Sequence, residues 1–190
     1  MDNFDLSLIV HRNQLGGLFK TMGYGVGAEI GVFKGKFSRT IFNGWGTDKQ
    51  LFLIDPWKHY DTGYECVDNK PQSQCDLMHA SVVDTFKAYP GVKVLRKESL
   101  QAVKDFEDGS LDWVFIDANH AYDSVKADMN AWWPKVRPGG LFSGHDYLNS
   151  LSKRADIGVK RAVDEFFQVL GLGSPSITSE SSPSWMVFKP

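Results

Sequence analysis

Runs of apolar residues that end in a carboxylate recur along this chain. Residues 50–55 form one such run and residues 111–117 form another, and each run ends in an aspartate. Continuous apolar runs of this length are typical of strands that are buried on both faces of a parallel sheet. Further strands are expected at 26–30, 92–95, 141–144 and 184–189, with a weaker one near 176–178.

Between these strands the apolar residues recur with helical spacing. Residues 159–170 carry apolar side chains at every third or fourth position and are followed by Gly171, which predicts an amphipathic helix with a glycine end. Other helices are expected at 6–22, 36–42, 76–89, 124–133 and from Ser99, as N-cap, to 106. Alternating strands and helices predict an α/β fold whose parallel sheet has helices on both faces.

The length of 190 residues suits one domain, here residues 1–190. Residues 1–24 are predicted to hold the N-terminal helix. Residues 56–75 are rich in Gly, Pro, Asn and aromatic residues and show no period, so we expect a lid loop there. Cys66 and Cys75 lie in or beside this loop and are expected to be two free thiols.

The charge balance narrows the possible partners. The chain has 21 Lys and Arg against 23 Asp and Glu, a formal charge of −2, so it lacks the basic field that binds nucleic acid. The first residues do not resemble a signal peptide, and no apolar run approaches the roughly 20 residues of a membrane span. We therefore expect a cytoplasmic protein with neither nucleic acid nor a membrane as partner, and leave a homo-oligomer open.

The stretch from 26 to 35 predicts a ligand cradle. A buried strand ends at Ile30, the chain turns at Gly31, and a helix opens near Gly35. Dinucleotides, phosphates and S-adenosylmethionine are all held by such turns. The glycine spacing differs from Gly-x-Gly-x-x-Gly, and Glu29 would repel a pyrophosphate while suiting the amino group of an amino-acid ligand, so a dinucleotide is disfavoured.

Asp55 stands about twenty residues beyond the glycine turn, at the end of the next strand. A carboxylate at that place can accept the hydroxyl groups of a ribose. The alternative is a turn aspartate before Pro56, a common arrangement. The glycines upstream favour the ribose interpretation.

Five segments resemble the class I S-adenosylmethionine-dependent methyltransferases. Residues 28–35, 53–57 and 97–99 are similar to the segments that hold the methionine, ribose and adenine parts of the cofactor, and 115–122 and 137–147 resemble the small bacterial branch of macrocin-type sugar O-methyltransferases and cephalosporin hydroxylase-like proteins. The resemblance implies a Rossmann-like, seven-stranded, mostly parallel sheet with an antiparallel last strand, the Trp185 segment beside the fifth. It also implies that the cofactor contacts are Glu29, Gly31, Val32, Phe33, Gly35, Asp55, Pro56, Trp57, Glu98, Ser99 and Asp117.

The same resemblance implies a divalent metal held by Asp117, His145 and Asp146. Two carboxylates suit Mg²⁺, which could lower the pKa of a substrate hydroxyl. His145 departs from the family pattern, which has an acid there. An imidazole among the ligands makes Mg²⁺ less favoured and favours Mn²⁺, Fe²⁺ or the absence of a metal.

His120 is the candidate general base. It follows Asp117 by three residues, just past a strand end, and an imidazole that titrates near neutral pH can take the proton of a hydroxyl. The alternative is that it helps cap the following helix. Tyr122 and Tyr147 are expected at the same mouth, whereas Trp132 and Trp133 are expected to pack on the sheet.

The predicted function is O-methylation of a small hydroxylated acceptor of sugar or natural-product type, with catalytic residues His120 and Asp117. The aromatic residues of the 56–75 loop, Trp57, Tyr60 and Tyr64, would cover the site and select the acceptor. Two alternatives stay open: a domain that binds S-adenosylmethionine or a nucleotide without catalysis, and a dinucleotide-dependent oxidoreductase.

Overall fold

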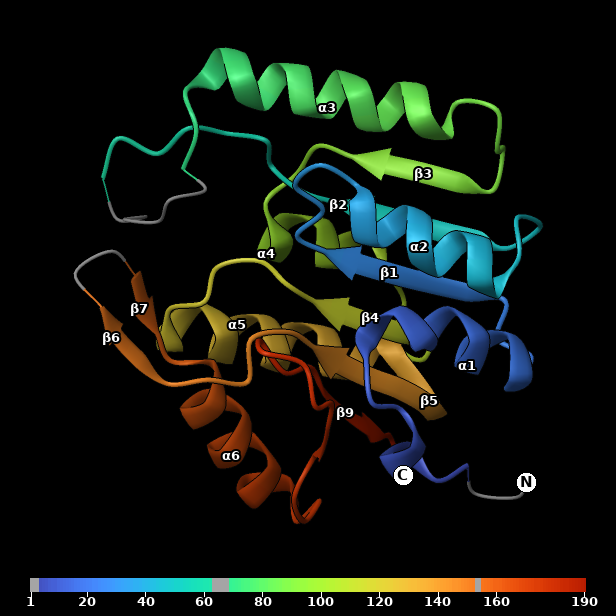
Figure 1. Cartoon of the computed structure of the whole chain (residues 1–190), viewed down its shortest axis with the longest axis vertical. Coiled ribbons are helices and arrows are strands. Elements are labelled where there is room, and N and C mark those ends of the chain that lie inside the picture. Colours follow the sequence, from blue (N-terminus) through green and yellow to red (C-terminus); the bar gives the residue numbers. More distant parts are fainter. Residues whose placement is uncertain (1–3, 63–68, 153–154) are drawn as a thin grey trace.

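A seven-stranded sheet forms the centre of the computed structural model, which describes residues 4–62, 69–152 and 155–190 (Figure 1). The strand order is β3-β2-β1-β4-β5-β9-β8. Neighbours among the first five strands pair in parallel, whereas β9 is antiparallel to both β5 and β8. The strands are β1 (Val26–Ile30), β2 (Gln50–Ile54), β3 (Val92–Leu95), β4 (Leu111–Ile116), β5 (Val136–Gly144), β8 (Ser176–Ile177) and β9 (Trp185–Phe188). The predicted fold class, including an antiparallel last strand beside the fifth, is confirmed.

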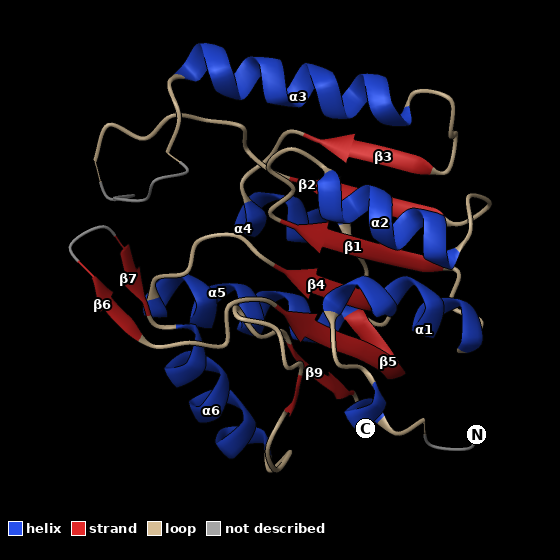
Figure 2. Cartoon of the chain, viewed as in Figure 1, coloured by secondary structure: helices blue, strands red, loops and turns tan. Residues whose placement is uncertain are grey.

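Helices cover both faces of the sheet (Figure 2). One core cluster joins it to α1 (Leu15–Thr21), α2 (Lys36–Trp45) and α3 (Gln72–Phe86). A second cluster on the other face joins it to α4 (Ser99–Ala102), α5 (Tyr122–Trp132) and α6 (Val159–Leu170).

The alternation of side chains along β4 explains why its sequence is apolar throughout. Trp113 and Phe115 enter the first core cluster, whereas Val114 and Ile116 enter the second. Trp132, which was expected to pack on the sheet, is fully buried in the second cluster, and Trp133 is partly buried against it. No helix in the described part of the chain is long and apolar enough to cross a membrane.

The expected helix over residues 6–22 is present only over its second half, as α1. The chain forms two 3-10 turns, η1 (Leu6–Leu8) and η2 (Arg12–Gln14), before α1 begins at Leu15. Asp5 caps the first turn, and His11 forms a capping box with Gln14 at the second. These local bonds satisfy the backbone in place of one continuous helix.

Several other element boundaries differ from the prediction, among them the end of α2, which extends to Trp45. Helix α3 begins at Gln72, directly after Pro71, and α5 begins at Tyr122. Helix α4 ends at Ala102 and continues as the 3-10 turn η3 (Val103–Asp105), and a further turn η4 (Trp133–Lys135) follows α5. Strand β5 begins at Val136 because a register shift against β4 absorbs the glycines before the apolar run.

Residues after β5 form a hairpin that was not predicted, β6 (Ser150–Ser152) with β7 (Ala155–Ile157). The expected lid loop ends at residue 71, since 72–75 belong to α3. Its residues 63–68, with Tyr64 and Cys66, lie outside the described part of the chain. Cys75 is a buried free thiol, as predicted, and the state of Cys66 stays a prediction.

Candidate active site

Four strand ends meet at one edge of the sheet. Ile30 of β1 lies opposite Ile54 of β2 and Ile116 of β4, and Gly144 of β5 lies opposite Ile116. The register therefore brings the next residue of each strand to the same edge: Gly31, Asp55, Asp117 and His145. Ligands of open α/β sheets bind outside this edge.

Gly31 is required by the close approach of two strand ends. Its φ is +89°, and a Cβ at this position would lie 2.0 Å from the carbonyl oxygen of Asp117. Any larger residue would push β1 away from β4. Gly35, also predicted as a cofactor contact, does not line the cavity of this site; it lies at the start of α2 with φ +67° and packs near Val82.

Asp55 holds the turn after Gly31 in place. Its Oδ2 accepts the backbone N–H groups of Val32 and Phe33 over 3.0 and 2.9 Å, and its Oδ1 accepts the N–H of Trp57 over 2.7 Å. A carboxylate oxygen has two lone pairs, so Oδ1 keeps one for a ligand hydroxyl. Of the two roles that the sequence left as alternatives, the structure shows the turn role, and the binding of a ribose hydroxyl by Asp55 stays a prediction.

A cavity of about 860 Å³ opens above this edge, within the usual range for small-molecule sites. Apart from Gly35, every predicted site residue lines it: Glu29, Gly31, Val32, Phe33, Asp55, Pro56, Trp57, Glu98, Ser99, Asp117, His120, His145 and Asp146. The sequence therefore located the cavity, although lining does not assign a role. Trp57, predicted as part of a lid, is 2% exposed and so is anchored in the core.

Glu29 is a buried carboxyl with one unpartnered oxygen. It is 2% exposed, and its Oε2 has no hydrogen bond among the described residues. Burial raises the pKa of Glu29 to about 8. An unpartnered buried acceptor beside a cavity fits a ligand that brings an amino group, because burial without a partner is costly.

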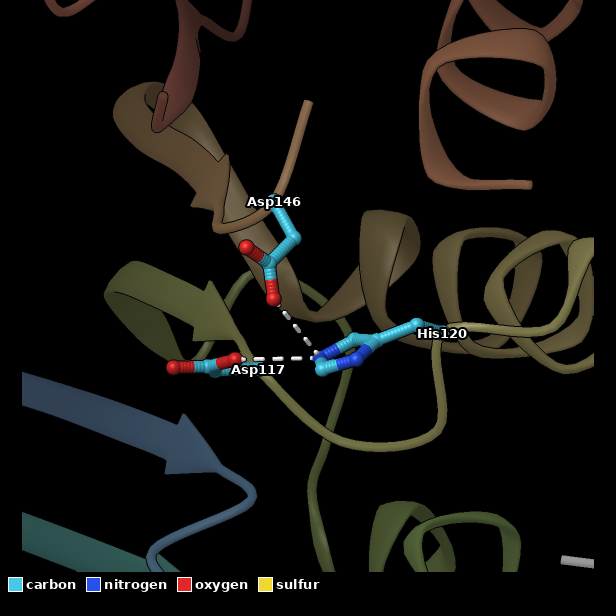
Figure 3. Close-up of side chains that lie close together, drawn as sticks. All are labelled: Asp117, His120 and Asp146. Carbon is cyan, nitrogen blue, oxygen red and sulfur yellow. Dashed lines mark hydrogen bonds and ion pairs between the residues drawn. The ribbon is translucent and has the colours of Figure 1, made fainter. Parts of the chain in front are cut away.

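Asp117, His120 and Asp146 converge at the ends of β4 and β5 (Figure 3). His120 Nε2 lies 3.2 Å from Asp117 Oδ1 and 3.4 Å from Asp146 Oδ2. His145 Nδ1 lies 3.6 Å from Asp117 Oδ1 and 3.4 Å from Asp146 Oδ1. One donor atom from each of Asp117, His120 and Asp146 lies within 4.8 Å of the others, so these three could hold a metal ion. The residues predicted as metal ligands do meet, but His120 takes the place of His145 in this set.

The imidazoles and carboxylates of this cluster shift one another's pKa values. Burial alone would raise the pKa of Asp117, but hydrogen bonds from His120 and His145 outweigh it and hold that pKa well below its usual range. Burial alone would lower the pKa of His145, yet its bonds to Asp117 and Asp146 raise that pKa to about 9. The pKa of His120 is also raised, for the same reason. His145 is therefore an imidazolium at neutral pH.

Glu98 and Ser99, at the start of α4, also line the cavity. Both oxygens of Glu98 accept from the hydroxyl of Tyr60, over 2.8 Å each. Ser99 was predicted to be the N-cap of α4 but is the first residue of that helix. Its hydroxyl donates to Asp128 Oδ1 over 2.5 Å and so does not cap the helix. Trp132 Nε1 donates to the same hydroxyl over 2.9 Å.

Tyr122 and Tyr147, expected at the mouth, do not line the cavity. Their hydroxyls donate to Glu165 and Asp164 of α6 instead. Among the lining residues that sequence reasoning missed are Arg12 and Asp128. Arg12 reaches Asp117 from the N-terminal segment, and Asp128 enters from α5. No local motif marks either one, because Arg12 is 105 positions from its partner.

Comparison with protein families gives a match over most of this region. The family described as "Methyltransferase domain" matches residues 28–147. This range includes the glycine turn, Asp55 and the four residues Asp117, His120, His145 and Asp146. An uncharacterized protein of Sinorhizobium fredii, y4gI, is 41% identical over 54 residues, 28% of this chain. The match spans only 6% of that protein's length.

Solved structures with the same fold include two O-methyltransferases. The enzyme TomG of Streptomyces achromogenes, involved in tomaymycin synthesis and solved with S-adenosylmethionine, is 15% identical, with a TM-score of 0.60 over 100% of this chain and 92% of that one. The O-methyltransferase of Bacillus cereus, solved with S-adenosylhomocysteine, is 14% identical, with a TM-score of 0.59 over 94% and 80% of the two chains. At these identities the likeness shows a shared fold.

Proposed function

The chain belongs to the class I S-adenosylmethionine-dependent methyltransferases, and on that premise we propose that it methylates a hydroxyl oxygen of a small acceptor with His120 as general base. The observation that carries this proposal is the position of His120. Its Nε2 faces the cavity end formed by the β4 and β5 strand tips, with a carboxylate on either side at 3.2 and 3.4 Å.

Residues of the cavity fit each part of the cofactor. Glu29, with its unpartnered Oε2, suits the amino group, and Asp117 can share it. Asp55 has one acceptor position left for a ribose hydroxyl, and Glu98 and Ser99 lie where the adenine would reach. When bound, the cofactor would supply an activated methyl group, so the protein need only align the acceptor, exclude water and remove a proton.

His120 is suited to the proton step. As a neutral imidazole it can accept the proton of an acceptor hydroxyl, and the adjacent carboxylates of Asp117 and Asp146 then stabilise the imidazolium that forms. The raised pKa of His120 supports this role, because it makes the imidazole a stronger base once deprotonated. Asp117 both orients the imidazole and lies next to the cofactor's place.

If a divalent ion bound at this site, its ligands would be Asp117, Asp146 and His120. Such an ion would lower the pKa of a bound hydroxyl. The two carboxylates, however, already face two positive groups, the imidazolium of His145 and the guanidinium of Arg12. Their negative charge is therefore neutralised without a metal ion. A metal on Nε2 would also prevent His120 from acting as base. We therefore favour metal-free proton transfer.

Oxygen as the methylated atom is supported by the base-type histidine, and two proteins of the same fold are named O-methyltransferases. A small hydroxylated acceptor of sugar or natural-product type is consistent with a cavity of about 860 Å³ that is lined by the Gly31 turn and also by Asp117, His120 and Asp146. The described part of the loop after β2, with Tyr60 on its inner side, would contribute to acceptor choice.

Methyl transfer from isotope-labelled S-adenosylmethionine to a panel of hydroxylated compounds tests this function. We expect transfer to at least one sugar or phenol, and we expect His120→Gln to lower its turnover by about 10²- to 10⁴-fold with little change in cofactor affinity. Cofactor binding without transfer to any acceptor would favour a non-catalytic binding domain. Unchanged turnover in His120→Gln would remove His120 as base.

A further inference from the structure

Arg12 projects from the N-terminal segment into the same cavity. Its Nη1 donates to Asp117 Oδ2 over 3.2 Å, and its guanidinium lies 4.8 Å from the ring centre of Phe37 in the first turn of α2. The side chain is 26% exposed. Figure 3 shows that one Asp117 oxygen faces His120 while the other points away from it. Arg12 therefore meets Asp117 on the side opposite the proposed base.

Glu180 fixes the segment that carries Arg12. Its Oε1 accepts the backbone N–H of Arg12 over 3.0 Å, and its Oε2 lies 3.4 Å from His11 Nε2. The Thr178 hydroxyl donates to Oε1 over 3.0 Å, which holds the carboxylate on the β8–β9 connection. The backbone N–H of Ser179 also donates to the carbonyl of Val10. An arginine that is held at its backbone in this way keeps its guanidinium in one region of the cavity.

The charges around Arg12 match those of an amino acid. Glu29 and Asp117 are acids that suit an ammonium group, and Arg12 lowers the pKa of Glu29 through space, so its charge lies near both. An α-amino acid carries an ammonium and a carboxylate on one carbon. Guanidinium groups pair with carboxylates through strong charge-assisted hydrogen bonds.

We propose that Arg12 binds the α-carboxylate of the cofactor's methionine part, and that Glu180 is its positioning residue. This inference rests on the proposed binding of S-adenosylmethionine in the cavity. On binding, Arg12 would exchange Asp117 for the ligand carboxylate, and Asp117 Oδ2 would become free to accept from the ligand's ammonium. The cofactor would thus satisfy three groups at once: Arg12, Asp117 and the unpartnered Glu29.

The lysines that line the cavity are less suited to this role. Lys34 and Lys36 are exposed, and Lys58 lies 3.4 Å from Glu98 at the adenine end. A cation in water binds a carboxylate weakly, because exposed ion pairs contribute little. An anionic acceptor is the rival ligand for Arg12. The position of Arg12 near Glu29, away from His120, favours the cofactor.

Three ligands separate these possibilities by calorimetry. S-adenosylhomocysteine carries the whole amino acid, its decarboxylated analogue lacks only the carboxylate, and 5′-methylthioadenosine lacks the amino-acid part. We expect the natural chain to bind S-adenosylhomocysteine more tightly than the decarboxylated analogue. In Arg12→Met the ratio of the two dissociation constants should shrink by about 10- to 100-fold. Affinity for 5′-methylthioadenosine should change less than about twofold, because that ligand makes no use of a charge-assisted bond at Arg12. Arg39→Gln, at an exposed position of α2 outside the cavity, is the matched control.

Glu180→Gln tests the positioning role. The amide can still accept the Arg12 N–H but loses the charge that faces His11 and Arg12. We expect a smaller loss of affinity for S-adenosylhomocysteine, with 5′-methylthioadenosine again unaffected. An equal loss for all three ligands in Arg12→Met, or an unchanged preference, would overturn the proposal while leaving the proposed function intact. If the natural chain bound none of the ligands, the proposed function would fail with it.

Discussion

The indole N–H of Trp57 donates to the carbonyl oxygen of Phe33 over 2.8 Å, and both residues have left-handed backbone conformations, with φ of +40° and +51°. Such conformations are unfavourable for residues other than glycine and persist only where surrounding contacts impose them. Here the Asp55 carboxylate holds the N–H of each residue. The two turns above β1 and β2 are thereby locked into one rigid cradle.

Trp57→Phe should loosen this cradle without emptying its place in the core. A smaller aromatic ring remains, but the hydrogen bond to Phe33 and part of the packing of the indole are lost, so we expect a loss of at least about 1 kcal/mol of stability toward urea. Affinity for S-adenosylhomocysteine should fall by several-fold, because the turn is no longer preorganised. Retention of full affinity would show that Asp55 alone is sufficient to hold the turn.

Gly31→Ala should be far more harmful than Gly23→Ala. Both glycines have positive φ, +89° and +67°, but a Cβ at Gly31 would overlap the Asp117 carbonyl, whereas nothing lies within 4 Å of one at Gly23. We expect Gly23→Ala to cost about 1–2 kcal/mol, the penalty of the left-handed conformation alone. Gly31→Ala should cost more and should abolish cofactor binding. Urea denaturation of the two variants checks this, and equal losses would contradict the close approach of β1 and β4.

Asp128→Asn should stabilise the protein at neutral pH. Asp128 is 5% exposed, and burial raises its pKa to about 6, above the value near 4 of an unfolded chain. The folded state therefore holds this proton more tightly, and stability falls as the pH rises through 4 to 6, by about 3 kcal/mol in total. The asparagine oxygen can still accept from Ser99.

Urea denaturation at pH 5 and pH 7.5 measures this effect. The gain of Asp128→Asn over the natural chain should be about 1–2 kcal/mol larger at pH 7.5 than at pH 5. A gain of the same size at both pH values would mean that the Asp128 carboxyl does not titrate in this range.

Chelation of metal ions should leave methyl transfer unchanged. The carboxylates of Asp117 and Asp146 already face His145 and Arg12, so the cluster lacks the excess negative charge that a divalent ion needs. The measurement compares turnover before and after EDTA, together with the metal content of the protein. Turnover that is lost with EDTA and restored by Mn²⁺ would assign Asp117, Asp146 and His120 to a metal instead.

The sequence predicted the sheet and most of the cavity because both depend on local signals. Apolar runs that end in aspartate identified β2 and β4. The parallel register then brings the next residue of each strand to one edge of the sheet, independently of where the helices pack. The positive φ of Gly31 has a direct signature in a glycine. These features needed no knowledge of distant contacts.

What the sequence could not predict depends on contacts between distant segments. The break of the 6–22 helix follows from caps at Asp5 and His11 that compete with helical spacing. Arg12 lines the cavity on a segment whose backbone is held by Glu180, 168 residues away in the sequence. Tyr147 follows a strand tip in sequence, yet its ring turns to α6 because Asp164 offers an acceptor. Periodicity carries no information about such pairs.

The cavity above Gly31 and Asp55 is expected to bind S-adenosylmethionine. Calorimetric titration of the purified chain with S-adenosylhomocysteine, and separately with NAD, measures this binding. We predict saturable binding of one S-adenosylhomocysteine per chain, lost in Asp55→Ala, and no binding of NAD. Binding of NAD without any binding of S-adenosylhomocysteine would contradict the account.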